Sequence, residues 1–106
     1  RGNHRVTELA DPRHPAVLRA IRSAVAATED TDAWVGLCGE MASDPAMTEL
    51  LVGLGIEELS VAPVAVPRVK RAVTEVRDGA ARQLAERALA AGTREAVERA
   101  IRDDGE

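Results

Sequence analysis

The sequence has almost no aromatic residues: Trp34 is the only one among 106, and there is no Phe or Tyr. A core of Ala, Val and Leu therefore lacks the side chains that each bury roughly 150–250 Å². A chain this short also buries a smaller share of its surface than a large domain does. Both facts favour an incomplete or oligomeric unit over a self-sufficient domain.

The sequence also has few cysteines, no excess of positive charge and no long apolar run, and each of these facts argues against a class of protein. A single cysteine cannot form an internal disulfide, which is typical of the reducing cytosol. The net charge of −4 provides no basic surface for a phosphate backbone, and bases would find no aromatic platform, so nucleic-acid binding is not expected. No apolar run approaches the length of a membrane span, and no signal peptide opens the chain at Arg1. We expect a cytoplasmic protein, and the start without methionine indicates a piece of a longer one.

Helix and strand signals alternate along the chain, which favours parallel β/α units. The first segment, 1–13, mixes Gly, Asn, Asp and Pro and predicts a loop. Two short apolar runs bounded by polar residues predict buried parallel strands. Because two strands can neither close a barrel nor cover a sheet, we expect part of a larger α/β fold. The expected elements are a helix from Pro15 to about Thr28, a strand Trp34–Leu37, a helix capped by Asp44 and Gly55, a strand Leu59–Ala62, a helix from Pro67, and helices over 80–90 and 94–102.

Cys38 directly follows the first predicted strand, where the functional residues of β/α barrels stand. Position alone is more typical of a buried structural cysteine, because free cysteines are among the most buried residues. Arg1 lies about one β/α repeat before Cys38, so a strand ending just upstream of it would place both on one rim. A guanidinium there suits phosphate or carboxylate, although a solvated terminal arginine fits the sequence alone better.

Five stretches, in order and over nearly the whole chain, resemble the end of Enzyme I, the phosphoenolpyruvate–protein phosphotransferase of the bacterial sugar phosphotransferase system. They are RGN (1–3), DPRHPAVLRAI (11–21), WVGLCGEMASDP (34–45), LLVGLGIEELSVAPVAVPRVKR (50–71) and AARQLAERALAAGT (80–93). Pyruvate phosphate dikinase and phosphoenolpyruvate synthase share a similar CGE or CGQ element. They match the loop before the first helix and the region after Ser60 less well.

The resemblance implies a fold and a reaction. Residues 1–106 would form the carboxyl-terminal part of a (β/α)8 TIM barrel that binds phosphoenolpyruvate, with its last two strands and final helices. The parent enzyme, a dimer, would pass a phosphoryl group to its own histidine and then, through an amino-terminal domain, to the phosphocarrier protein HPr. Its Mg²⁺ ligands would lie outside this chain.

Matched onto this sequence, Cys38 falls on the family's proton donor and Arg1 on an arginine that holds the phosphate. Asn3, Gly39 and Glu40 would support the site, Glu40 by orienting the Cys38 loop. A thiol has an ordinary pKa of about 8.5, so it keeps its proton near neutrality and could protonate the enolate of pyruvate. A non-catalytic, self-associating module remains the alternative for the chain by itself, since two parallel strands leave edges and faces that invite pairing.

Overall fold

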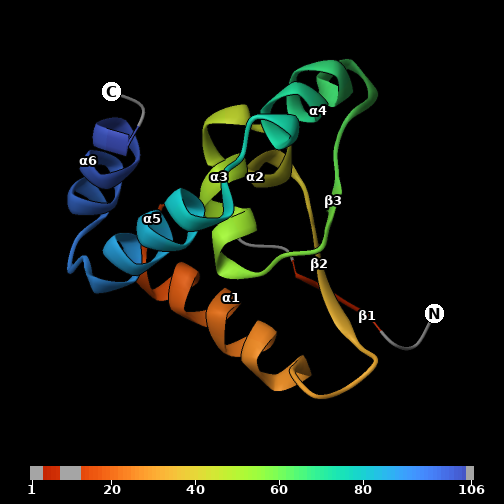
Figure 1. The fold of residues 1–106 in the computed structure, drawn as a ribbon, viewed down its shortest axis with the longest axis horizontal. Coiled ribbons are helices and arrows are strands. Elements are labelled where there is room, and N and C mark those ends of the chain that lie inside the picture. Colours follow the sequence, from red (N-terminus) through yellow and green to blue (C-terminus); the bar gives the residue numbers. More distant parts are fainter. Residues whose placement is uncertain (1–3, 8–12, 105–106) are drawn as a thin grey trace.

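A computed structural model describes residues 4–7 and 13–104 of the chain. Its centre is a three-stranded parallel sheet in the order β1-β2-β3, with β1 at His4–Thr7, β2 at Trp34–Cys38 and β3 at Glu58–Ser60 (Figure 1). The register pairs Val35 with Arg5 on one side, and Leu37 with Leu59 on the other. The α/β class and the two predicted strands are therefore confirmed.

The expectation of a loop over 1–13 is wrong for His4–Thr7, which form β1. The sheet accordingly has three strands and not the expected two. The four residues of β1 lack the apolar run that predicts a buried strand, and Gly and Asn precede them. They are a strand because they pair with β2, and pairing between distant segments leaves little trace in the local sequence.

Helix α1, Pro15–Thr28, connects β1 to β2 and confirms the expected helix. Proline occupies its first turn, and the His14 side chain accepts a hydrogen bond from the Ala16 N–H at 3.1 Å. Leu18, Ile21 and Val25 are buried along one face, as their spacing predicts. The helix thus covers the sheet while completing a parallel crossover.

Helix α3, Pro45–Leu54, connects β2 to β3 and has both predicted caps. The Asp44 carboxylate accepts from the Ala46 N–H at 3.0 Å, and Gly55 is left-handed with φ of 102°. One helical turn before it, α2 at Glu40–Ser43, was not expected. Strand β3 also ends earlier than Ala62, because the Ala62 N–H donates to Ser43 Oγ and not to a neighbouring strand.

The remaining helices follow the prediction closely. A 3₁₀ turn, η1 at Pro63–Ala65, leads into α4 at Val66–Thr74, one residue before the expected start. Helix α5, Asp78–Ala90, begins two residues early, and α6, Arg94–Asp104, extends two residues beyond its expected end. Thr93 caps α6 as predicted, accepting from the Ala96 N–H at 3.1 Å. No helix among the described residues is long and apolar enough to cross a membrane.

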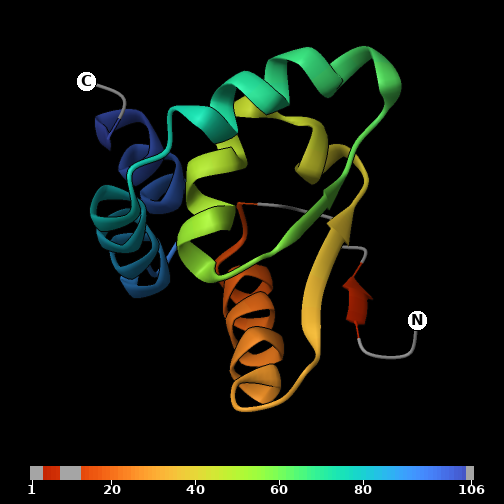
Figure 2. The same ribbon diagram turned by 45° about the vertical axis from the view of Figure 1, so that its right-hand side comes forward.

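Helices α1, α3 and α5 lie on one side of the sheet, and α4 lies beyond the carboxyl ends of its strands (Figure 2). Val35 and Leu37 of β2 point to that side and are almost fully buried in a core built with α1, α3 and α5. Since side chains alternate along a strand, Trp34 and Cys38 belong to the opposite face, and both are half-buried. We call this the open face. Across it, the Trp34 indole N–H donates to Glu58 Oε1 of β3 at 3.2 Å.

Helices α3 and α5 make the most extensive helix–helix contact in the described structure. Gly53 permits it: a Cβ built on Gly53 would lie 2.6 Å from the Ala81 carbonyl carbon, closer still to its oxygen, and 3.3 Å from Ala85 Cβ. Small residues face each other here, so the two backbones approach closely. This contact holds the carboxyl-terminal helices against the layer that covers the sheet.

Candidate functional site at the carboxyl end of the sheet

Cys38 is the last residue of β2 and stands at the carboxyl end of the sheet. It was expected just after the strand, so the structure moves it by one position. Cys38 pairs in register with Ser60, the last residue of β3, and is a half-buried free cysteine. It is therefore not enclosed between helices, and its thiol belongs to the open face. This is the rim at which parallel β/α folds bind ligands.

The chain turns sharply directly after Cys38. Gly39 has φ of 96° and ψ of −166°, a combination that essentially only glycine adopts. A Cβ at Gly39 would meet no atom within 4 Å, so the requirement comes from the backbone and not from crowding. Glu40 then begins α2 and is exposed. The turn brings the chain from the strand into α2 within two residues.

Polar contacts join the loops that surround this turn. Ser43 Oγ accepts from the Ala62 N–H at 3.2 Å, which connects the loop after β2 to the segment after β3. Arg13 Nη2 lies 3.4 Å from Asp44 Oδ2, which connects the segment before α1 to the start of α3. Sequence reasoning missed Ser43 and Arg13 as site residues. Both lie in stretches that carry the resemblance, but no local pattern singles either of them out, and the contacts join segments 19 and 31 residues apart.

The other predicted site residues, Arg1 and Asn3, lie outside the described residues. Strand β1, a neighbour of β2 in the sheet, starts at His4, after Arg1 in the chain. A strand ending just upstream of Arg1 would lie outside the described residues, so the place of Arg1 relative to Cys38 stays a prediction. The roles of Arg1 and Asn3, like those of Gly39 and Glu40, therefore stay predictions from the resemblance.

The part of the chain that the structure describes contains no set of side chains that could bind a metal ion. No three His, Cys, Asp or Glu side chains converge there closely enough to hold an ion. Magnesium prefers several oxygen ligands at short distances, which a lone surface carboxylate cannot supply. The described residues thus supply no Mg²⁺ site, and the expectation that the ligands lie outside this chain stays a prediction. No step of the chemistry below passes through a metal.

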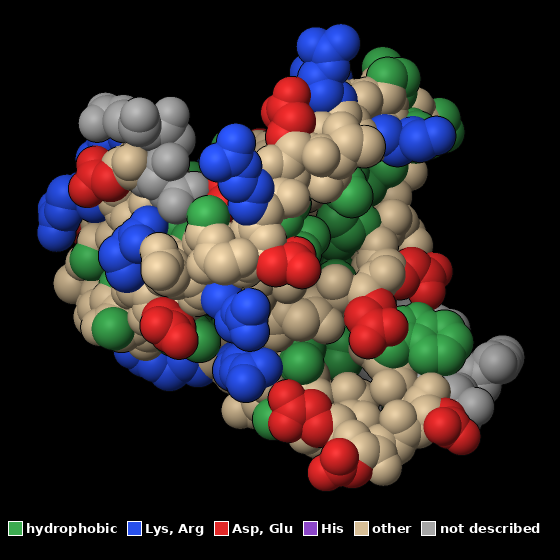
Figure 3. Space-filling model, viewed as in Figure 1, with side chains coloured by type: hydrophobic (Ala, Val, Ile, Leu, Met, Phe, Trp, Pro, Cys, Tyr) green, Lys and Arg blue, Asp and Glu red, His purple; other side chains and the backbone are tan. Residues whose placement is uncertain are grey.

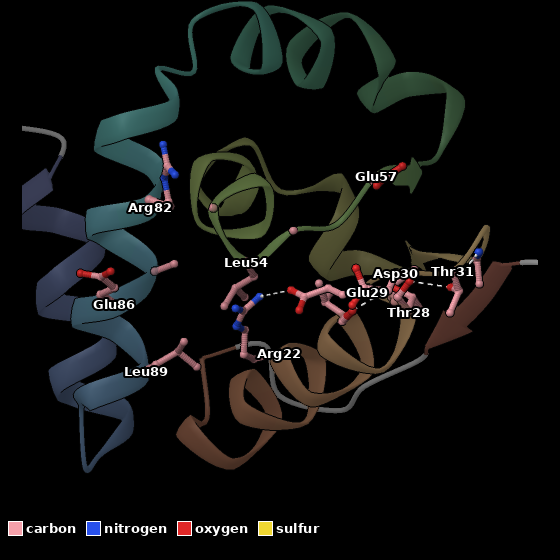
Figure 4. Close-up of a pocket in the computed structure, with 16 residues that line it drawn as sticks. Arg22, Thr28, Glu29, Asp30, Thr31, Leu54, Glu57, Arg82, Glu86 and Leu89 are labelled. Carbon is pink, nitrogen blue, oxygen red and sulfur yellow. Dashed lines mark hydrogen bonds and ion pairs between the residues drawn. The ribbon is translucent and has the colours of Figure 1, made fainter.

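A hollow lies at the opposite, amino end of the sheet (Figure 4). Its volume is about 510 Å³, and α1, α3 and α5 contribute to its walls. Arg22 points toward Glu29 across it, with Nη1 and Oε2 3.8 Å apart and both side chains largely exposed. Ion pairs this exposed contribute little to the stability of the fold. Cys38 does not line this hollow, so it is separate from the candidate site.

Charge is distributed unevenly between these two regions (Figure 3). Acidic side chains gather below, near the turn that follows α1, where Glu29, Asp30 and Asp32 are exposed. Basic side chains stand above on α4, where Arg68 and Arg71 line a groove against the start of α3. Helix α4 follows the carboxyl end of β3. Exposed basic side chains thus stand on the helix that follows β3, whereas exposed acidic ones gather at the turn before β2.

Comparison with known proteins gives a consistent result. Residues 1–77 match the family described as "PEP-utilising enzyme, PEP-binding domain", in which PEP is phosphoenolpyruvate. A phosphoenolpyruvate-protein phosphotransferase of Haloferax volcanii is 61% identical over 97 residues, which are 92% of this chain and 17% of that protein. A multiphosphoryl transfer protein of Xanthomonas campestris is 45% identical over 97 residues, covering 92% of this chain and 12% of its own length.

A third relative, a phosphoenolpyruvate-protein phosphotransferase of Haemophilus influenzae, is 36% identical over 103 residues, covering 97% of this chain and 18% of its own length. The chain thus spans less than a fifth of each of these relatives. The family match includes all three strands, α1 to α4 and the turn at Cys38. On this match, the chain belongs to the family of PEP-utilising enzymes, within their PEP-binding domain.

Proposed function

We propose that the chain is the carboxyl-terminal part of the phosphoenolpyruvate-binding barrel of a cytoplasmic phosphoenolpyruvate–protein phosphotransferase. The observation that carries the proposal is the place of Cys38, on the open face at the carboxyl end of a parallel sheet, inside the region that matches the PEP-binding domain. The names of the relatives from Haloferax and Haemophilus support the same reaction.

A (β/α)8 barrel would account for the one-sided sheet. In such a barrel, parallel strands turn one face to the outer helices and the other to the interior. Val35 and Leu37 are buried under helices here, whereas Glu58 and Ser60 are exposed on the open face. We propose that strands from the rest of a longer protein cover this face. The thiol of Cys38 would then stand at the mouth of the barrel, where barrel enzymes bind substrate.

The proposed chemistry is protonation of a carbanion-like intermediate. A histidine elsewhere in the enzyme takes the phosphoryl group, so that a P–N bond forms, the P–O bond of phosphoenolpyruvate breaks, and its electron pair stays on the enolate of pyruvate. The Cys38 S–H then gives its proton to the methylene carbon of the enolate. The product is pyruvate, and the thiolate left on Cys38 regains a proton from water. General acids of this kind act best when held within hydrogen-bond reach of the accepting atom.

Substrate binding would depend on groups beyond Cys38. Arg1 is proposed to hold the phosphate, since a guanidinium binds phosphate oxygens with two parallel hydrogen bonds. Arginines on α4 would add a favourable field at this end of the sheet. Mg²⁺ in the parent enzyme would be held by residues outside this chain. HPr would receive the phosphoryl group through another domain of the same enzyme.

The full-length enzyme containing this chain should take up label from phosphoenolpyruvate that is labelled in the phosphoryl group. We expect one equivalent of acid-labile protein-bound label, an equal amount of pyruvate, and loss of the label when HPr is added. Scintillation counting and a coupled pyruvate assay measure both. Label that enters the protein but never reaches HPr would favour the dikinase or synthase alternative. An absence of both label and pyruvate would refute the proposal.

The 106-residue chain by itself should associate with further copies. Its open face carries the half-buried Trp34 and Cys38, and Val64, near the end of the sheet, is 81% exposed. Exposed apolar surface next to a sheet without a covering layer favours self-association. Sedimentation velocity over a hundredfold concentration range should reveal a dimer or larger species. A monomer throughout that range would exclude the alternative role as a self-associating module.

A further inference from the structure

Ser43, the last residue of α2, connects the two strand ends of the candidate site. Its Oγ accepts a hydrogen bond from the Ala62 N–H at 3.2 Å, and its own N–H donates to the Gly39 carbonyl oxygen at 3.2 Å. One contact reaches the segment that follows β3, and the other reaches the turn that follows Cys38. Ser43 is thus bonded to the two chain segments that leave the carboxyl ends of β2 and β3.

These contacts close a ring around the Cys38 turn. Cys38 pairs in register with Ser60, and Ala62 is two residues further along the chain from Ser60. From Ala62 the ring continues through the hydrogen bond to Ser43, then through the hydrogen bond to Gly39, and returns to Cys38 along the chain. A ring of covalent and hydrogen bonds allows fewer orientations of the turn than an open chain does.

The turn needs such a restraint because of its own composition. Gly39 has no side chain to pack, and its positive φ is a conformation that glycine leaves easily. The Asp44 side chain, by contrast, is fixed twice, by capping α3 through Oδ1 and by pairing with Arg13 through Oδ2. Ser43 therefore lies between Asp44, whose side chain is held twice, and the glycine turn at Gly39, and its hydroxyl joins them to the segment that follows β3.

We infer that Ser43 is a positioning residue that holds the Cys38 thiol toward one face of the enolate. The inference rests on the proposed function, because it assigns a partner residue to the proposed proton donor. Ser43 does not touch the reacting atoms in this view. Its contribution to stability is small, since Ala62 is exposed and water can bond its N–H when the hydroxyl is removed.

The test is Ser43→Ala in the full-length enzyme, measured as pyruvate formation. We expect kcat to fall about tenfold with KM for phosphoenolpyruvate unchanged, because misplacing a reacting group by a fraction of an ångström lowers the rate without weakening binding. Phosphoenolpyruvate with deuterium at one vinyl position, converted in tritiated water, gives pyruvate with a chiral methyl group. The parent enzyme should protonate one face only, and Ser43→Ala should give a partly racemic methyl group. Ser43→Thr keeps the hydroxyl and should restore both values.

Two further variants make the outcomes decisive. Thr74→Ala removes a hydroxyl from the exposed end of α4, where it bonds only the Arg71 carbonyl oxygen in the contacts described, and should leave rate and configuration unchanged. Parental kcat and an undiminished chiral methyl group in Ser43→Ala would overturn the inference, as would a loss that Ser43→Thr does not repair. Cys38→Ala distinguishes a failure of the proposed function from a failure of the role of Ser43. If Cys38→Ala keeps the parental kcat and the chiral methyl group, the proposed function itself is refuted.

Discussion

Replacing Cys38 by alanine in the full-length enzyme is expected to slow pyruvate formation from phosphoenolpyruvate by about 10²–10⁴-fold, the usual contribution of a positioned general acid. The variant removes the only thiol of this chain from the carboxyl end of β2. Water must then supply the proton to the enolate without fixed geometry. Steady-state assays coupled to pyruvate reduction measure the loss, and rapid-quench labelling separates it from the phosphoryl-transfer step.

Cys38→Ser is the matched variant for this experiment, because it replaces only the thiol by a smaller hydroxyl and keeps the rest of the side chain. A serine hydroxyl is far less acidic than a thiol, so we expect the serine variant to be nearly as slow as the alanine variant. Both should retain the parental thermal stability within a few degrees, since Cys38 is half-buried at a strand end. Parental rates in both variants would remove Cys38 from the mechanism.

Gly53→Ala is expected to lower the free energy of unfolding of the 106-residue chain by about 3 kcal/mol or more. The new methyl group would overlap the carbonyl of Ala81 on α5, which is backbone and cannot rotate away. Helix α5 must shift outward, and the contact that covers α3 opens. Ala85 Cβ, at 3.3 Å from the new atom, restricts the direction of that shift. Urea unfolding followed by far-ultraviolet circular dichroism measures the loss.

Gly79→Ala is the control for this experiment. Gly79 lies in the first turn of α5, and a Cβ there meets no atom within 4 Å. Alanine should therefore raise the free energy of unfolding by about 0.5–1 kcal/mol, because it restricts the unfolded chain and suits a helix. The two variants make the same chemical change with opposite expected signs. Equal stabilities of Gly53→Ala and the parent chain would contradict the close α3–α5 packing.

Local sequence signals sufficed for much of the fold. Helix α3 was predicted with its caps because Asp44-Pro45 and Gly55 satisfy backbone groups within a few residues of themselves. Strand β2 was predicted because a short apolar run between polar turns is typical of a fully buried strand. The placement of Cys38 at the carboxyl end of a parallel strand follows from these two elements, since β2 must end where the turn toward α3 begins.

The features that sequence reasoning missed depend on contacts between distant segments. Strand β1 owes its conformation to pairing with β2, and β3 ends at Ser60 because Ala62 bonds Ser43 instead. Helix α2 is a single turn, too short to show a periodic pattern. The polar contacts around the Cys38 turn likewise join residues that stand far apart in the sequence. The local sequence around either residue of such a pair does not predict the contact.

The lone indole of the chain gives an optical signal that needs no added dye. Trp34 lies on the open face, at the end of β2 remote from Cys38, and its N–H bonds Glu58 on the next strand. When a neighbouring layer covers this face, the surroundings of the ring change from aqueous to apolar, and its emission should move to shorter wavelength. The emission spectrum of Trp34 can therefore report whether other strands cover the open face of the sheet.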